Sequence, residues 1–265
     1  MVWRDPASIA ASMVSRTSNP SSSSLINCAA NLLRGSPAEA TRPQIPRQFP
    51  SFIAQYSVFY QHHLVDIETA ARIQNIEVIP GLLRISNDEI DPDNQLECLH
   101  LPNLEVVEGS IRARDDSIGG PSLGEMPEEI TFESLTTVGE DFSFAQLGES
   151  LKRIDALVLT TINAETDGSD DFIQGAYFVG NAGLVEVLMP SLEEAYHISV
   201  KENPVLETFD VSSFEEIARW GWVQVTENPS FSSWEAQAIG DEFGDEGRTE
   251  VCDNYDDGCD EACDG

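Results

Sequence analysis

The stretches NIEVIPGLLRISND (residues 75–88) and NLEVVEGSIRARDD (residues 103–116) are nearly the same phrase, written 28 residues apart. Asn, Glu, Val, Gly, Arg and Asp keep their places, while the apolar positions vary among Ile, Leu, Val and Ala. Self-similarity at a fixed spacing indicates a repeat protein, and a true repeat recurs beyond two copies. Further copies are therefore expected along the chain.

Three longer segments align with one another: LECLHLPNLEVVEGSIRAR (96–114), LVEVLMPSLEEAYHISVKEN (184–203) and LETFDVSSFEEIARWGWVQVTEN (206–228). Weaker copies are FESLTTVGEDFSF (132–144) and LKRIDALVLTTI (151–162). The alignment makes apolar residues equivalent, in the sets Leu96, Leu184 and Leu206; Leu99, Val187 and Phe209; Leu101, Met189 and Val211; and Leu104, Leu192 and Phe214. Asn181, Asn203 and Asn228 mark the joins between units. The sequence thus predicts at least six turns.

Each unit carries two short strand signals separated by corners. One alternates apolar and polar residues, as in LHL (99–101), VLM (187–189) and FDV (209–211). The other follows a corner, as in LLRI (82–85), SIRA (110–113), HISV (197–200) and WVQV (222–225). Units of 22 to 28 residues with two or three strands leave no room for a helix. Stacked turns of this kind share one core, so we expect an all-β solenoid of about six or seven coils with the repeated Leu, Ile and Val residues buried.

An L-x-x-L-x-L phrase is typical of leucine-rich repeats, whose next landmark is an Asn eight residues after the first Leu. Here Leu104, Leu192 and Phe214 occupy that place, which disfavours a horseshoe built on an asparagine ladder. With the phrase LP-x-L-x-x-V-x-G-x-I and the Asn-Pro joins at 203–204 and 228–229, residues 62–252 resemble the receptor L-domain family. The resemblance implies a right-handed β-helical ligand-binding module, as in insulin-receptor-like ectodomains, fungal wall proteins and bacterial envelope proteins. It does not imply signalling, because no kinase or furin-like Cys-rich module accompanies the repeats.

The charge of the chain limits its partners. Its 47 acidic and 14 basic residues give a net charge of −33, which repels nucleic acids and anionic membranes. Residues 1–50 carry five Arg against Asp5 and Glu39 and sum to +3, so the remainder holds −36. We therefore predict a disordered leader at 1–52, a solenoid domain at 53–251 and an acidic Cys-containing tail at 252–265. No stretch approaches the roughly 20 apolar residues of a membrane span, and no signal-peptide core is visible.

The chain has five cysteines, at 28, 98, 252, 259 and 263, and the C-x6-C-x3-C spacing of the last three matches no zinc signature. A disulfide among Cys252, Cys259 and Cys263 is expected in an oxidising compartment, and the odd count leaves one thiol unpaired or bridged to Cys98. Asp253, Asp257 and Asp260 could form a loose Ca²⁺ loop, although a solvated acidic terminus is the simpler interpretation. No cofactor or metal ligands are assigned.

Residues for catalysis are scarce. Ser122 lies in GPSLG, but a nucleophile elbow needs a strand before and a helix after it, and Pro127 follows closely. His100 and His197 alternate with core residues and are expected to point outward as ordinary surface residues. Basic residues that could support a polysaccharide lyase are few. We therefore expect a protein without catalytic residues.

The remaining hypothesis is an extracellular or cell-envelope module that recognises a protein or a glycan through the solenoid face. The Trp residues of WGW (220–222) are the best anchor candidates, with one of Trp220 and Trp222 expected in the core. Two alternatives stay open: a structural envelope spacer without a ligand and, less favoured, a Ca²⁺-dependent β-helical enzyme acting on polysaccharides. The lack of N-x-S/T sequons favours a bacterial origin.

Overall fold

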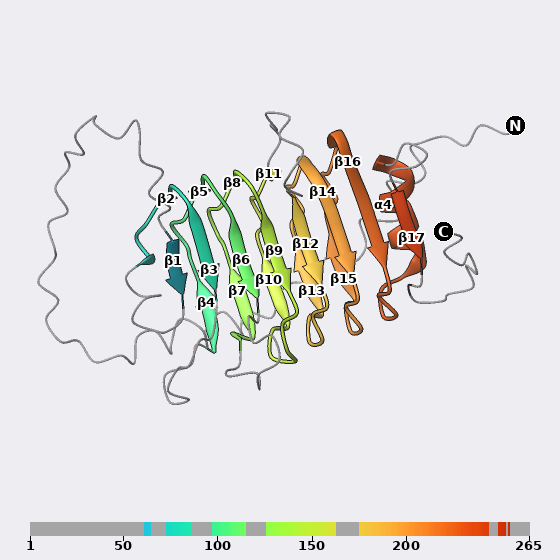
Figure 1. Cartoon of the computed structure of the whole chain (residues 1–265), viewed down its shortest axis with the longest axis horizontal. Helices are drawn as coiled ribbons and strands as arrows, with labels where there is room; N and C mark the ends of the chain where they lie inside the picture. Colours follow the sequence, from blue (N-terminus) through green and yellow to red (C-terminus); the bar gives the residue numbers. More distant parts are fainter. Residues whose placement is uncertain are drawn as a thin grey trace, which may run out of the picture. The chain divides into compact units, whose positions relative to one another are not determined.

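The computed structural model describes residues 61–64, 73–85, 97–114, 126–162, 175–243, 249–252 and 254 (Figure 1). These residues are mostly β, with one short helix, α4 (Ser233–Phe243), and every strand pair among them is parallel. The predicted leader and, apart from Cys252 and Asn254, the predicted tail lie outside this described part of the chain. Among the described residues, no helix combines the length and the apolar character needed to cross a membrane.

The first sheet has five short strands in the order β15-β13-β10-β7-β4. Their bounds are β4 (Cys98–His100), β7 (Glu129–Thr131), β10 (Arg153–Asp155), β13 (Glu186–Leu188) and β15 (Thr208–Asp210). The middle residue of each strand points inward, and these residues align in register as Leu99, Ile130, Ile154, Val187 and Phe209. The predicted equivalence of Leu99, Val187 and Phe209 is therefore confirmed.

The second set of strands begins with β2 (Val78–Ile79), β5 (Val106–Val107), β8 (Thr137–Val138) and β11 (Thr161–Ile162). It continues into the first residues of two longer strands, β14 (Glu194–Lys201) and β16 (Glu216–Thr226). Its buried residues also stack in register: Ile79, Val107, Val138, Ile162 and Ala195.

The third set comprises β1 (Gln61–Leu64), β3 (Leu82–Ile85), β6 (Ile111–Arg114), β9 (Phe142–Ala145), β12 (Ala176–Val179), the last residues of β14 and β16, and β17 (Thr249–Cys252). We call it the third sheet, although β14 and β16 run through both sets and join them into twelve hydrogen-bonded strands. Figure 1 shows its strands side by side along the chain. Each strand pairs with its counterpart one repeat away, a topology compatible with an all-β solenoid.

The core lies between these sheets and is filled by the residues that the repeat alignment predicts. Leu101, Leu104, Met189, Leu192 and Leu206 are all buried. Five phenylalanines form a continuous aromatic cluster with ring centroids 5.0 to 6.0 Å apart, namely Phe132, Phe142, Phe144, Phe178 and Phe209. Aromatic pairs at these distances add to the gain from burying apolar area.

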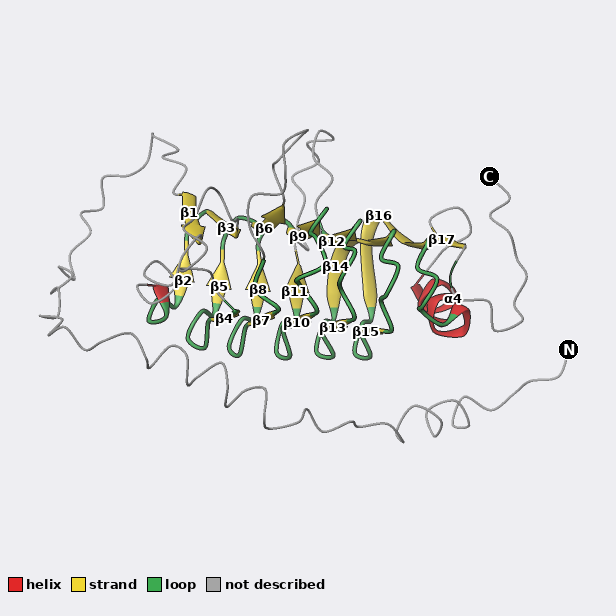
Figure 2. Cartoon of the chain, turned by 90° about the horizontal axis from the view of Figure 1, so that it is seen from below, coloured by secondary structure: helices red, strands yellow, loops and turns green. Residues whose placement is uncertain are grey.

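Helix α4 follows the last full repeat and was not predicted. It packs against β16 and β17 at one end of the row of strands (Figure 2). Phe231, Ala236 and Ile239 turn inward and are buried there, so the helix covers apolar surface that another turn would otherwise cover. The sequence did contain a signal for the helix, because Ser232 and Glu235 have the spacing of a capping box.

Four asparagines at the joins form a hydrogen-bonded ladder between repeats. Nδ2 of Asn181 donates to Oδ1 of Asn203 over 3.0 Å, Asn203 donates in the same way to Asn228 over 3.0 Å, and Asn228 donates to Asn254 over 3.1 Å. Each Oδ1 also accepts from the backbone N–H of the preceding ladder residue, at 3.1, 3.1 and 3.3 Å. The leucine-rich-repeat position is apolar as predicted, but an asparagine ladder is present elsewhere in the unit.

The ladder also satisfies backbone carbonyls inside the molecule. Asn181, Asn203 and Asn228 have no exposed surface, and their Nδ2 groups donate to the carbonyls of Phe144, Phe178 and Val200, respectively, at 2.8 to 3.0 Å. Unpaired buried carbonyls are costly, so these side chains allow the chain to turn a corner inside a closed stack.

Replacing a core residue tests the register. Leu192→Asp should destabilise the fold by ~3 to 5 kcal/mol, because Leu192 is fully buried and the new carboxylate would lack a partner. Glu193→Ala, one residue later and exposed, should change stability by less than ~0.5 kcal/mol. Urea unfolding of the two variants measures the difference, and equal midpoints would contradict the assignment of inward and outward positions.

A second test concerns the ladder. Asn203→Ala removes the side-chain donor to the Phe178 carbonyl, the acceptor of the Asn181 backbone N–H and one of the two acceptors of Asn181 Nδ2, and should cost about 3 kcal/mol or more. Asn103→Ala is the matched control, because Asn103 is exposed and donates a single bond to the Gln74 carbonyl. Its loss should cost less than ~1 kcal/mol. Comparable thermal unfolding of both variants would show that the buried ladder carries no special weight.

Candidate functional site

A row of outward side chains crosses the third sheet at right angles to its strands. Their neighbours in sequence point into the core, and register places one side chain on each successive strand. We call this set the polar row: Arg84, Arg112, Ser143, Tyr177, Ser199, Gln224 and Glu250. Arg84 lies at one end of the row and Glu250 at the other, with the five remaining members between them.

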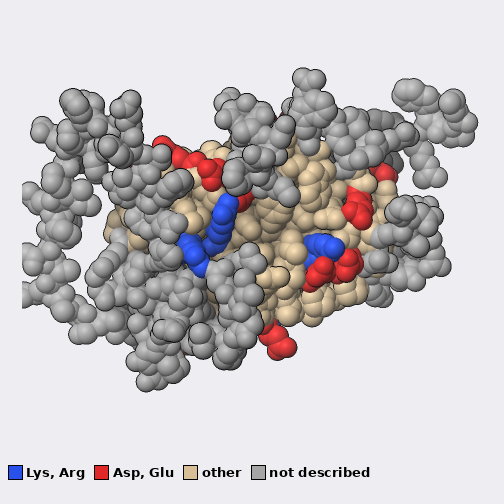
Figure 3. Space-filling view, viewed as in Figure 1, with Lys and Arg blue, Asp and Glu red and all other residues tan. Residues whose placement is uncertain are grey.

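The polar row contains one acidic residue, Glu250, in a chain of net charge −33. The second set of strands differs, since exposed glutamates precede its strands at Glu77, Glu105, Glu193 and Glu215. Figure 3 shows the third sheet facing the viewer, with large uncharged areas and only a few places of red or blue between the grey atoms. The strands of the first sheet, by contrast, include Glu129, Glu186 and Asp210 among only five short strands.

An ion pair lies beside the row. Nε of Arg112 donates to Oδ2 of Asp141 over 2.9 Å, and Nη2 contacts the same oxygen. Ser110 Oγ is 3.4 Å from that oxygen and donates to Glu140 over 2.8 Å. Asp141 is only 5% exposed, and burial raises its pKa against the opposing effect of Arg112. Its second oxygen, Oδ1, is buried without a hydrogen-bond partner.

Tyr177 is next to this ion pair on β12. The residue is half-buried, yet its hydroxyl oxygen is buried without a hydrogen-bond partner. Burial raises the pKa of Tyr177, and the nearby charge of Asp141 raises it further. The exposed part of the side chain is therefore its carbon surface. An exposed aromatic surface among hydroxyl and amide groups can stack against an apolar ring face of a ligand.

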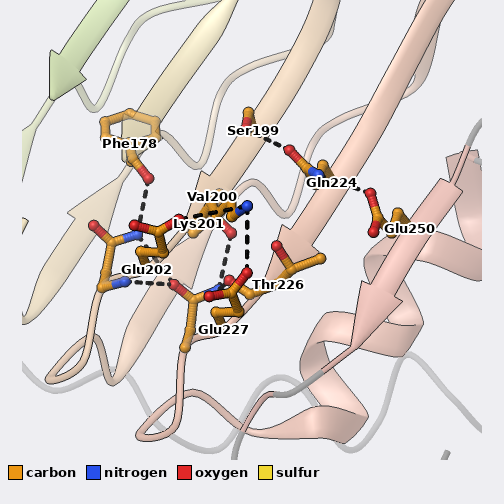
Figure 4. Close-up of polar contacts among 11 residues, drawn as sticks. Phe178, Ser199, Val200, Lys201, Glu202, Gln224, Thr226, Glu227 and Glu250 are labelled. Carbon is orange, nitrogen blue, oxygen red and sulfur yellow. Dashed lines mark hydrogen bonds and ion pairs between the residues drawn. The ribbon is translucent and has the colours of Figure 1, made fainter. Parts of the chain in front are cut away.

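The end of the row near β17 is held by hydrogen bonds between side chains (Figure 4). Ser199 Oγ donates to Gln224 Oε1 over 3.2 Å, and Gln224 Nε2 donates to Glu250 over 2.7 Å. Lys201 is two residues after Ser199 on β14. Its Nζ lies 3.4 Å from Oε1 of Glu202 and 3.3 Å from Oε1 of Glu227. These contacts fix the orientation of the polar groups before any ligand arrives.

A second cluster lies at the corner where β14 and β16 pass between sheets. One residue separates Ala195 from His197 on β14, whereas four separate their partners Ile217 and Trp222 on β16. The His197 ring is 4.4 Å from the ring centroid of Tyr196 and 4.9 Å from that of Trp222. β16 thus has three extra residues at this corner, and they form a bulge. Bulges are over-represented next to functional sites.

His197 corrects a prediction. Its position alternates with the core as expected, but it is only 5% exposed, and its Nδ1 accepts the backbone N–H of Trp222 over 3.0 Å. Burial lowers the pKa of His197 to about 4. The alternation of apolar and polar residues predicts which way a side chain points, but not how much of it is exposed. The rings of Tyr196 and Trp222 pack against His197 and bury it. Trp222 is half-buried, while the side chain of Trp220 lies outside the described residues.

The other residues singled out in the sequence lie either outside the described part of the chain or apart from the polar row. Ser122 and the aspartates of the tail loop lie outside the described residues. His100 is on the first sheet, with Nε2 3.0 Å from Glu133. Within the described ranges, no group of three or more His, Cys, Asp or Glu side chains is placed to hold a metal ion.

Two cysteines bear on the compartment. Cys98 on β4 and Cys252 on β17 are both disulfide-bonded. Cys252 ends β17, so its disulfide begins on a strand of the third sheet. The pairing with Cys259 or Cys263 stays a prediction.

The first sheet carries the other charged cluster. Arg153 Nε donates to both oxygens of Asp155 over 2.9 and 3.0 Å, and Nη1 donates to Glu186 over 2.6 Å. Asp155 is buried, and this burial raises its pKa. Because one guanidinium binds both carboxylates, the cluster is a closed ion-pair network with no free acid and base pair.

Comparison of the chain with family models, curated proteins and solved structures found no match. The similarity to receptor L-domains therefore rests on the sequence motifs alone.

His197 predicts a pH dependence of stability. Its pKa is about 4 in the folded protein and about 6.5 when unfolded, so the unfolded chain binds more protons between these values. Stability from this group is complete above pH 6.5 and is lost as pH falls to 4, by about 2 to 3 kcal/mol. His197→Asn keeps an acceptor for the Trp222 N–H and should lack this loss. Urea unfolding at several pH values compares the two proteins.

The comparison isolates His197, because the carboxylates, including Asp141 with its raised pKa, titrate in both proteins. Parallel pH profiles for the wild type and the variant would contradict the buried, neutral imidazole.

Proposed function

We propose that the chain is a non-catalytic binding module that recognises a protein or a glycan through the outer face of the third sheet. The observation that carries this proposal is the polar row, in which an aromatic ring and uncharged polar groups on successive strands separate two arginines from a single acidic residue, Glu250. A ligand that lies flat on this sheet favours uncharged groups at its centre, because unpaired charges would lose their hydration in the complex.

The proposed architecture is a right-handed β-helix of six or seven coils, similar to a receptor L-domain. Parallel pairing between equivalent strands and the stacked core support it. In such a module the sheet is a rigid platform, and its side chains are spaced by the strand separation of about 4.8 Å.

The proposed location is extracellular or in the cell envelope. The disulfides of Cys98 and Cys252 support it, because disulfides persist in oxidising compartments. The acidic surface disfavours nucleic acids and anionic membranes as partners. Ca²⁺ ions at the acidic tail stay a prediction, as do the spacer role and the polysaccharide-active enzyme as alternatives.

Ser143→Glu tests this function. Ser143 lies in the middle of the polar row and is half-buried, so glutamate adds bulk and charge where a ligand would lie. Thr208→Glu is the matched control, because Thr208 is equally half-buried and outward on the first sheet. Both variants should melt as the wild type does. In screens against glycan and envelope-protein arrays, we expect ligands that are lost with Ser143→Glu and kept with Thr208→Glu.

Two results would overturn the proposal. One is a set of ligands that bind Ser143→Glu as they bind the wild type, which would place recognition elsewhere. The other is turnover of a polysaccharide substrate, with or without Ca²⁺, which would make the protein an enzyme.

A further inference from the structure

We infer that the ligand of the polar row is a neutral oligosaccharide chain lying across the strands over Tyr177; this inference rests on the proposed function and specifies its ligand class. The argument depends on the dimensions of the face, its charges and the chemistry of its exposed groups.

The dimensions favour a long, narrow ligand. Eight strands, from β1 to β17, form the third sheet, and seven spacings of about 4.8 Å give a length of about 34 Å. Its four-residue strands, such as β9 and β12, give a width of about 13 Å. The face therefore covers about 440 Å², roughly half of the 800 Å² that each partner buries in a standard protein–protein interface. A saccharide chain along the row fits this long, narrow face better than a globular protein partner does.

The charges favour a neutral ligand. The described basic side chains of this face already have partners: Arg112 binds Asp141, Lys201 lies between Glu202 and Glu227, and Arg84 is also engaged. An acidic ligand would have to displace these partners and approach a chain of net charge −33. Neutral sugars face neither cost.

The exposed groups favour sugar hydroxyls. Ser143 and Gln224 offer a hydroxyl and an amide group on β9 and β16, and such groups both donate and accept hydrogen bonds, whereas Ser199 between them is only 3% exposed. Ser199 instead acts from below, because its hydroxyl donates to Gln224 Oε1 and so orders the Gln224 amide in advance. Tyr177 lies between Ser143 and Ser199 and exposes carbon surface while its hydroxyl is buried. It can therefore stack against the C–H face of a sugar ring.

The burial of the Tyr177 hydroxyl gives a sharp test. Tyr177→Phe keeps the exposed ring and removes only a buried oxygen that has no partner, so affinity should stay within about twofold of the wild type. Tyr177→Ala removes the stacking surface and should weaken binding by about tenfold or more. Probes are hexasaccharides and trisaccharides of β-linked glucose and of β-linked mannose, with hexagalacturonate as the anionic comparison. Titration calorimetry measures each affinity.

We expect at least one neutral hexasaccharide to bind more tightly than its trisaccharide, since the row spans several sugar units. Its affinity should be insensitive to salt up to about 1 M, where charge interactions over more than a few ångströms are screened. Melting curves identify any variant that fails to fold, and Ser143→Glu, which should abolish binding, serves in place of Tyr177→Ala if that variant unfolds.

Three outcomes would overturn the inference: no neutral hexasaccharide binds, hexagalacturonate alone binds, or folded Tyr177→Ala and Ser143→Glu bind like the wild type. If neutral sugars fail but a purified protein ligand from the array is lost with Ser143→Glu, the ligand class is wrong and the binding face stands. If no ligand of any class depends on Ser143, both proposals fail.

Discussion

Backbone hydrogen bonding between equivalent strands of successive repeats is the constraint on which the rest of the structure depends. A strand of two to four residues cannot bury its own apolar side, and here each one pairs in parallel with its counterpart in the next repeat. Register then places equivalent residues directly above one another. The same rule that stacks Leu99, Ile130 and Ile154 in the core lines up Ser143, Tyr177 and Ser199 on the outside.

The corners of each repeat set the second constraint, because a chain that turns inside a stack leaves backbone groups away from water. In the described part of the chain, three non-glycine residues at these corners have positive φ: Gln146, Glu202 and Glu227. Asn203 and Asn228 follow two of them, and their side chains bond the carbonyls that the turns expose. Leu147 follows the third, and its N–H donates to Asn181 over 3.2 Å. Left-handed backbone is costly for such residues, so the buried hydrogen bonds offset a local strain.

Much of this could be predicted from the repeats. The strand LLRI at 82–85, the apolar set with Leu192 and the outward direction of Glu193 all follow from periodicity, since the core imposes it on the sequence. The burial of His197 could not, because it depends on the rings of Tyr196 and Trp222, which meet only after β16 gains its extra residues.

Other features had a signal that periodicity does not detect. The sequence places Asn181, Asn203 and Asn228 at the joins between repeats. Only the stacking of the repeats brings each of their side chains within hydrogen-bond distance of the next asparagine. Helix α4 ends the series of repeats, and its signal is a capping box, Ser-x-x-Glu, which is a local motif and not part of the repeat. The polar row is not apparent in the sequence, since Arg112 and Ser143 are 31 positions apart and become neighbours only when β6 pairs with β9.

The stacking of one row member per strand also has an evolutionary consequence. Duplication or deletion of a whole repeat would lengthen or shorten the outer face by one strand spacing without disturbing the contacts of more distant repeats. The reach of the surface is therefore inherited in discrete steps, whereas its chemistry changes by point substitution at single outward positions such as Ser143 or Gln224. Selection can act on the size of the platform and on its selectivity as two separate traits.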